Sequence, residues 1–160
     1  MNRNCLLILA LWTIYCASQA ALAEPIPLSK ISCSSVEITP IMQTDELKLH
    51  SWSSTSIIRD QSTRGEPDVS EHCVGTTMTH GDQTTMRGYC VSLNPNGDQV
   101  LVEVSREGEG PGTWQLIDGT GGSAGITGTG SFRVITEARP IQEGTWQGCN
   151  EIEGNYTVPE

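Results

Sequence analysis

The sequence predicts an all-β fold, a barrel or sandwich in which consecutive strands pair antiparallel. Three observations support this prediction. No segment of the chain carries the apolar period of an amphipathic helix. Short runs rich in Thr, Val and aromatic residues recur at even spacing, and Gly, Pro, Asn or Asp residues lie between them. The chain has 160 residues, of which 17 are Gly, and this length has room for one domain.

Residues 1–23 have the pattern of a secretory signal peptide. One positive side chain, Arg3, precedes an apolar stretch from Cys5 to Ala17, and the small residues after it end in an A-x-A site at Ala23. An uncleaved membrane anchor fits less well, because the apolar stretch is short. A lipoprotein site at Cys16 fits less well too, because bulky residues precede it. We expect cleavage after Ala23, a single domain over residues 24–160, and a periplasmic or secreted protein.

Eight strands are expected in the remaining chain, separated by turn signals. The strongest turn signals are Asn94–Asp98, Glu107–Pro111 and the pair Arg139-Pro140. The expected strands are Ser34–Met42, Glu46–Ile58, Glu71–Thr79, Thr84–Leu93, Gln99–Arg106, Gly112–Asp118, Ser131–Thr136 and Gly144–Asn150.

Four cysteines remain after cleavage, which predicts two disulfides in an exported protein. The runs on either side of Gly81-Asp82 have the pattern of a hairpin with a two-residue turn. In that register Cys73 lies directly opposite Cys90, at a non-hydrogen-bonded position where the Cα separation suits a disulfide. We therefore predict Cys73–Cys90 and, by elimination, Cys33–Cys149. A turn at Asp82-Gln83, or a longer one, would break this register.

The glycine-rich segment Asp118–Gly130 invites a nucleotide-binding interpretation, since Gly119–Ala124 matches the G-x-G-x-x-A pattern. That motif requires a helix whose N-terminus holds the pyrophosphate, and the residues that follow predict a strand instead. No cofactor is therefore expected. Glycine here allows the tight bends of a coiled barrel strand.

Several of these motifs resemble exported bacterial proteins of the allene oxide cyclase/dirigent-like barrel group. The resemblance covers roughly Cys73 to Tyr156. It is carried by Arg87–Cys90, Asn96–Asp98, Gly112–Trp114, Gly119–Gly121, Gly125–Gly130 and Gly144–Cys149. It implies an eight-stranded antiparallel up-and-down β-barrel with a central cavity. Relatives in that group cyclise a fatty-acid epoxide or steer the coupling of bound phenolics, but their catalytic residues have no matching positions here, and fold alone does not transfer an activity.

Strand alternation divides the side chains of the Cys73–Cys90 hairpin between two faces. The first face holds most of the large apolar residues, and we expect it to point into the barrel. This face carries His72, Val74, Thr76, Met78, Arg87, Tyr89, Val91 and Leu93. The opposite face carries Cys73, Gly75, Thr77, Met86, Gly88 and Cys90.

On this assignment Arg87, Tyr89 and His72 line a pocket for a small, partly apolar, anionic compound. A buried guanidinium needs an anion, and Glu103 and Asp118 are candidate partners within the protein. Glu103 therefore joins the candidate ligand-binding set. The alternative, which we favour, places Arg87 at the barrel rim with its guanidinium in water.

Composition excludes some functions. The net charge of −10 disfavours nucleic acid as a partner, and no apolar run in the mature chain is long enough to span a membrane. No catalytic residue is predicted, because the chain has no nucleophile elbow, and the absence of C-x-x-C pairs argues against a metal site. The leading hypothesis is a barrel that binds a small hydrophobic, amphipathic or phenolic molecule. The alternatives are an envelope protein with a filled barrel and an isomerase- or cyclase-like enzyme.

Overall fold

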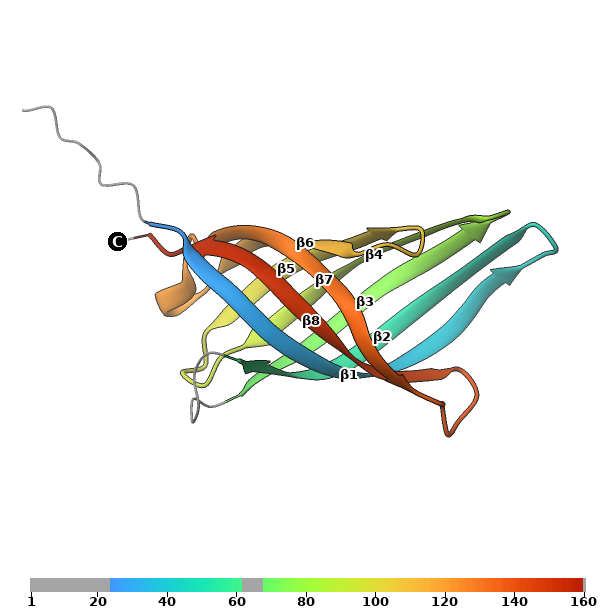
Figure 1. The fold of residues 1–160 in the computed structure, drawn as a ribbon, viewed down its shortest axis with the longest axis horizontal. Coiled ribbons are helices and arrows are strands. Elements are labelled where there is room, and N and C mark those ends of the chain that lie inside the picture. The colour runs from blue at the N-terminus through green and yellow to red at the C-terminus, as the bar shows by residue number, and fades with distance from the viewer. Residues whose placement is uncertain (1–23, 62–67, 160) are drawn as a thin grey trace, which may run out of the picture.

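Eight antiparallel strands form a closed barrel in the computed structural model, which describes residues 24–61 and 68–159 (Figure 1). Each strand pairs with the next along the chain, and β1 pairs with β8 to close the cylinder. The expected up-and-down barrel is therefore confirmed. The strands are β1 (Ile26–Gln43), β2 (Leu47–Asp60), β3 (Val69–His80), β4 (Gln83–Leu93), β5 (Gln99–Glu107), β6 (Gly112–Gly119), β7 (Thr127–Ala138) and β8 (Thr145–Thr157).

The predicted hairpin register is confirmed. Gly81 and Asp82 form the turn between β3 and β4, and Gly81 has a φ of 58°, a conformation that glycine adopts without strain. Cys73 lies opposite Cys90 and is bonded to it, and Cys33 is bonded to Cys149. The first disulfide joins neighbouring strands of one hairpin, whereas the second joins β1 to β8 across the closure of the barrel.

The strands are strongly staggered. A row of paired residues that starts at Leu28 on β1 and passes through β8, β7, β6, β5, β4, β3 and β2 returns to β1 at Ile38. Such a stagger accompanies strand tilt in a closed barrel, and an eight-stranded barrel of this kind can hold one small ligand.

Large aromatic side chains lie over inward-facing glycines on neighbouring strands. Trp52 on β2 covers Gly75 and Gly88, which are paired across β3 and β4. Trp114 on β6 covers Gly130 and Gly154, which are paired across β7 and β8. A Cβ at any of these glycines would collide with an indole ring, so the glycines let the tryptophans lie flat against the wall.

The glycine-rich connection between β6 and β7 covers one end of the barrel. It contains the short 3₁₀ turn η1 (Gly121–Ser123), and Ile126 after it is buried. Asp98 accepts a hydrogen bond from the backbone N–H of Gly122, and Asp118 accepts bonds from those of Gly119 and Gly125. Among the described residues, no helix has the length and apolar character needed to cross a bilayer.

Candidate functional site

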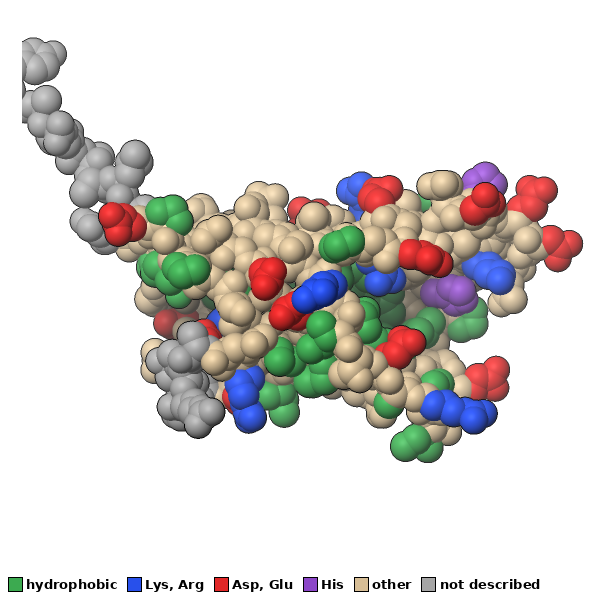
Figure 2. All heavy atoms as spheres, in the orientation of Figure 1, with side chains coloured by type: hydrophobic (Ala, Val, Ile, Leu, Met, Phe, Trp, Pro, Cys, Tyr) green, Lys and Arg blue, Asp and Glu red, His purple; other side chains and the backbone are tan. Residues whose placement is uncertain are grey.

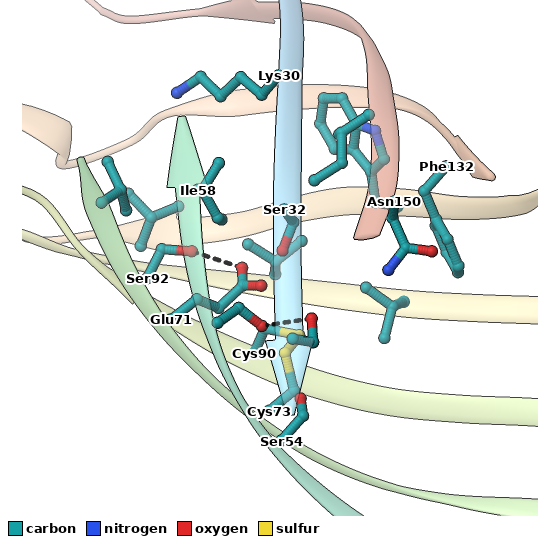
Figure 3. A pocket seen from close by; sticks show the side chains of 18 of the residues that line it. Lys30, Ser32, Ser54, Ile58, Glu71, Cys73, Cys90, Ser92, Phe132 and Asn150 are labelled. Carbon is teal, nitrogen blue, oxygen red and sulfur yellow. Dashed lines mark hydrogen bonds between the residues drawn. A yellow bond between two sulfur atoms is a disulfide. The ribbon is translucent and has the colours of Figure 1, made fainter. Parts of the chain in front are cut away.

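A cavity of about 970 Å³ occupies the barrel interior. Its walls are the inward-facing positions of all eight strands, and Figure 3 shows part of the lining. The side chains at these positions include many small ones, such as Ser32, Ser54 and Cys90, and a wall of small side chains leaves space at the centre. The volume lies within the range of ligand pockets for small molecules.

Four polar residues form a row across the β1–β4 side of the cavity. Ser34, Ser56, Glu71 and Ser92 are paired in register on successive strands. The Ser34 and Ser56 hydroxyls lie 2.8 Å apart, and the Ser92 hydroxyl donates a 2.8 Å hydrogen bond to Oε2 of Glu71 (Figure 3). We call these four residues the polar row. It is a set of hydrogen-bonding groups built on rigid strands and directed at the cavity.

Glu71 is the acid of this row, and its side chain is partly buried. The accessible part of the Glu71 side chain faces the cavity, because this side chain is one of those that line the cavity. Desolvation by the surrounding protein raises the pKa of the Glu71 carboxyl, and the Ser92 hydrogen bond and the charge of Lys30 lower it to a smaller extent. A carboxyl with a raised pKa can hold a proton under milder conditions than an exposed one and donate it to a neighbouring acceptor.

The β5–β8 side of the cavity is mainly apolar. Buried Val102 and Trp114 form a cluster with partly buried side chains around them. The apolar residues on this side include Val100, Val102, Val104, Trp114, Leu116, Phe132, Val134, Trp146 and Ile152. The cavity thus presents a polar row to one side of a bound molecule and a hydrocarbon wall to the other.

A gap in the strand pairing opens the cavity at the end opposite the glycine-rich connection. The pairing of β6 with β7 ends at Gly112 and Phe132, and the later residues of β7 pair only with β8. In Figure 1 the turn between β5 and β6 stands apart from the turn between β7 and β8. A second hollow of about 610 Å³ lies here and shares Arg106, Val134 and Glu137 with the main cavity.

The expected orientation of the β3–β4 hairpin is wrong. Cys73 and Cys90 are 6% and 3% exposed and face the cavity, whereas Val74 and Tyr89 are 50% and 53% exposed on the outer surface. The larger apolar side chains point outward because the inner face is occupied by the disulfide and by the glycines under Trp52. Small residues on the inner face keep the interior open.

The predicted site residues consequently lie outside the cavity. Arg87 and Tyr89 are exposed on the outer face of β4, and His72 is exposed beside them on β3. Glu103 pairs with Tyr89 on that same face. The Arg87 guanidinium is in water, as the favoured alternative expected, but on the outer wall, and it lies 3.8 Å from Glu107 instead of pairing with Glu103 or Asp118.

Sequence reasoning missed Glu71, Ser92 and Arg106. One signal could have found Glu71 and Ser92. Disulfide cysteines are among the most buried residues of small exported domains, so the cysteine face of the hairpin is the better choice for the interior. Strand alternation from Cys73 and Cys90 then turns Glu71 and Ser92 inward.

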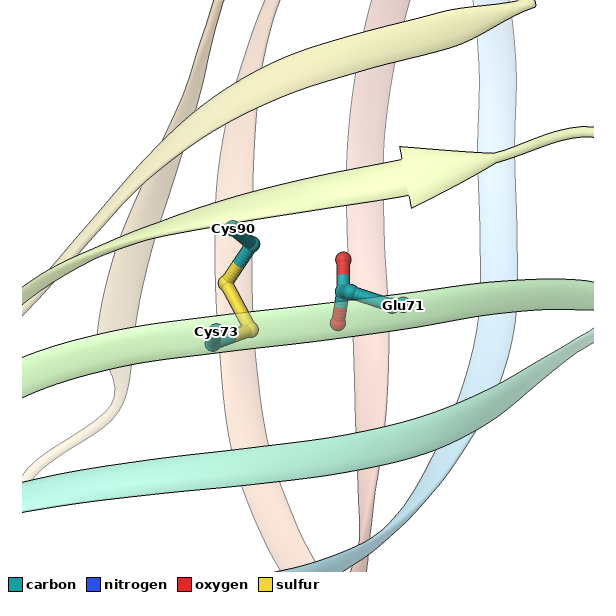
Figure 4. Close-up of side chains that lie close together, drawn as sticks. All are labelled: Glu71, Cys73 and Cys90. Carbon is teal, nitrogen blue, oxygen red and sulfur yellow. A yellow bond between two sulfur atoms is a disulfide. The ribbon is translucent and has the colours of Figure 1, made fainter.

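Glu71, Cys73 and Cys90 lie close together, with their potential ligand atoms within 4.8 Å of one another (Figure 4). Both cysteine sulfurs are consumed by the disulfide. Metal ligation by cysteine requires a thiolate, so in the oxidised protein this cluster offers one carboxylate and carries no metal centre.

No protein-family model matches the chain, and no curated protein matches it. Among solved structures, the chain is similar to the pterocarpan synthase dirigent protein GePTS1, with a TM-score of 0.47 and 7% sequence identity. The alignment covers 86% of this chain and 93% of that one. The candidate site is therefore assigned from the residues of this chain alone.

Proposed function

We propose that the barrel binds one small, largely apolar molecule in its interior. The observation that carries this proposal is the cavity of about 970 Å³, which the described side chains leave open between the polar row and the apolar wall. Burial of hydrocarbon surface against the wall supplies the driving force, at roughly 25 cal/mol per Å². The polar row supplies orientation.

The polar row also indicates which group the molecule carries. Glu71 has one oxygen bonded to Ser92, and no described side chain is bonded to the other. A hydroxyl on the ligand, such as that of a phenol, could donate to this oxygen when the carboxylate is charged, and a ligand carbonyl could accept from it when it is protonated. A hydrophobic molecule with one such oxygen fits both sides of the cavity.

Native mass spectrometry tests the proposal. The protein is purified from the organism that makes it, and its native mass is compared with its denatured mass. Val102→Phe places a large side chain in the cavity, and Leu101→Phe places the same side chain on the outer face as a matched control. We expect a retained non-protein mass in the wild type and in the control, and less of it in Val102→Phe. Equal retention in both variants would contradict binding inside the barrel.

Acid–base chemistry on the bound molecule is a second candidate function. It is favoured by the raised pKa of Glu71 and by the Ser92 hydrogen bond that holds its carboxyl in place. The test is to incubate the compound recovered from the native protein with wild type and Glu71→Gln. Isomerisation by the wild type alone supports an isomerase- or cyclase-like enzyme, and an unchanged compound in both supports binding without turnover.

We also propose that the chain is exported and cleaved after Ala23. The supporting structural feature is the pair of disulfides, which persist in oxidising compartments. Residues 1–23 lie outside the described residues. Mass measurement of the native protein checks the cleavage: a chain that begins at Glu24 supports it, and a chain that retains residues 1–23 contradicts it.

A further inference from the structure

Arg106 lies on the inner face of β5 at the gap in the strand pairing. It lines both the main cavity and the second hollow, so its side chain stands where the two meet. Figure 2 shows hydrophobic side chains gathered in a hollow of the molecular surface. A molecule that enters the barrel through this gap passes the Arg106 guanidinium.

The charge of Arg106 has no partner among the residues that the structure describes. Its Nε is shielded from solvent and donates no hydrogen bond. Of the four other arginines that the structure describes, Arg59, Arg87 and Arg133 each lie within ion-pair distance of a carboxylate, and Arg139 is exposed to water. A shielded cationic donor without an acceptor is costly, because it loses its hydration without gaining a replacement.

We propose that Arg106 binds the carboxylate of an amphiphilic ligand whose apolar part extends into the barrel. The inference rests on the proposed function and narrows the class of molecule. A carboxylate is the natural complement of a guanidinium, which can donate two parallel hydrogen bonds to it. Val134, shared by both hollows, continues the hydrocarbon wall from the gap to the interior.

The surroundings of Arg106 favour a ligand head with a single negative charge. Glu137 lines the same two hollows, and its Oε2 accepts a 3.1 Å hydrogen bond from the Trp146 indole N–H. Glu137 is exposed, so water screens its charge more than that of the half-buried Arg106. One guanidinium beside one carboxylate can accommodate a monoanion, whereas a phosphate dianion would meet stronger repulsion from Glu137.

Calorimetric titration with decanoate and decan-1-ol tests the proposal, because the two probes share a chain and differ in the head group. The wild type should bind decanoate more tightly than decan-1-ol. Arg106→Met should lower decanoate affinity about tenfold and leave decan-1-ol affinity unchanged, as expected for one lost charged hydrogen bond. Arg87→Met removes an equal charge from the outer wall and should change neither affinity.

Glu137→Gln provides a second, independent variant. Removal of this carboxylate should raise decanoate affinity and leave decan-1-ol affinity as it was. Failure of both probes to bind the wild type contradicts the proposed function itself. Binding of both probes with equal affinity, or an equal loss of both in Arg106→Met, leaves the cavity intact as a binding site and overturns the role of Arg106.

Discussion

Among single residues, Glu71 combines partial burial, a hydrogen bond accepted from Ser92 and an opening to the cavity. Its raised pKa means that the folded protein holds a proton on this group more tightly than the unfolded chain does. By linkage, the contribution of Glu71 to stability is greatest below the ordinary carboxyl pKa and is lost as the pH rises through the raised value. Glu71 is therefore a group whose charge the fold tolerates at a cost in stability.

Glu71→Gln should remove that cost, because the amide is uncharged and its oxygen can still accept the Ser92 hydrogen bond. The variant should be more stable than the wild type at neutral pH, and the difference should shrink as the pH falls to about 4, near the ordinary pKa of glutamate. Urea unfolding at several pH values, with the disulfides intact, measures this. A difference in unfolding free energy that does not vary with pH would show that Glu71 is not desolvated.

Hydrophobicity alone could not predict which side chains of each strand face the cavity and which face outward. In a solid core the larger apolar face of a strand points inward, because filling the interior maximises burial. A barrel with an open cavity reverses this on β4, where Gly88 and Cys90 face inward and Tyr89 and Val91 face outward. Arg106 was missed because its significance depends on the gap between β6 and β7, which no local pattern reveals.

At the level of the strands, tryptophan rings that pack on glycines of neighbouring strands shape the cavity wall. The Trp52 ring occupies the space over Gly75 and Gly88, and a Cβ at Gly88 would lie 2.6 Å from the ring and 2.7 Å from the carbonyl oxygen of Val74. Because that oxygen belongs to the paired strand, the crowding cannot be relieved by a side-chain rotation alone. The glycine pair is therefore required for the tryptophan to lie flat.

Gly88→Ala should lower the free energy of unfolding by about 1–3 kcal/mol, as overpacking of a filled site does. Gly110→Ala is the matched control, because a Cβ there meets nothing within 4 Å and the backbone has no positive φ. Urea unfolding of the two variants gives the comparison, and near-ultraviolet circular dichroism reports whether Trp52 has moved. Equal stability of the two variants would contradict a close contact between Trp52 and Gly88.

Strands whose pairing is local were the most predictable elements. The β3–β4 hairpin was predicted with the correct register, because the turn residues and both cysteines lie within one short segment. The start of β1 was missed: the strand begins at Ile26 instead of Ser34, and residues 26–33 are held by pairing with the distant β8. Likewise, β7 begins at Thr127 inside the glycine-rich segment, because Gly128 and Gly130 accommodate side chains from β8 and β6.

For the molecule as a whole, the closure of β1 onto β8 creates the enclosed interior, and the Cys33–Cys149 disulfide holds this closure. The two disulfides differ in environment. Cys33 is exposed on the outer wall, whereas Cys73 and Cys90 are buried on the inner wall. Reduction requires access of a thiolate to the sulfur, so the closure disulfide is the more vulnerable of the two.

Limited reduction followed by alkylation and peptide mapping should therefore label Cys33 and Cys149 before Cys73 and Cys90. The double variant C33S/C149S should lose about 4–5 kcal/mol of unfolding free energy in the chain-entropy account, given a sequence separation of 116 residues. Earlier labelling of Cys73 and Cys90 would show that the barrel interior admits reductant more readily than its outer wall.

The most direct test of the central claim uses the tryptophans that line the cavity. Trp52, Trp114 and Trp146 all face it, and they are the only tryptophans left if residues 1–23 are removed. Titration with decan-1-ol should produce a saturable change in their fluorescence with one site per chain in the wild type and in Leu101→Phe, and no such change in Val102→Phe. Absence of a saturable change in the wild type, or an unchanged response in Val102→Phe, would contradict a ligand cavity inside the barrel.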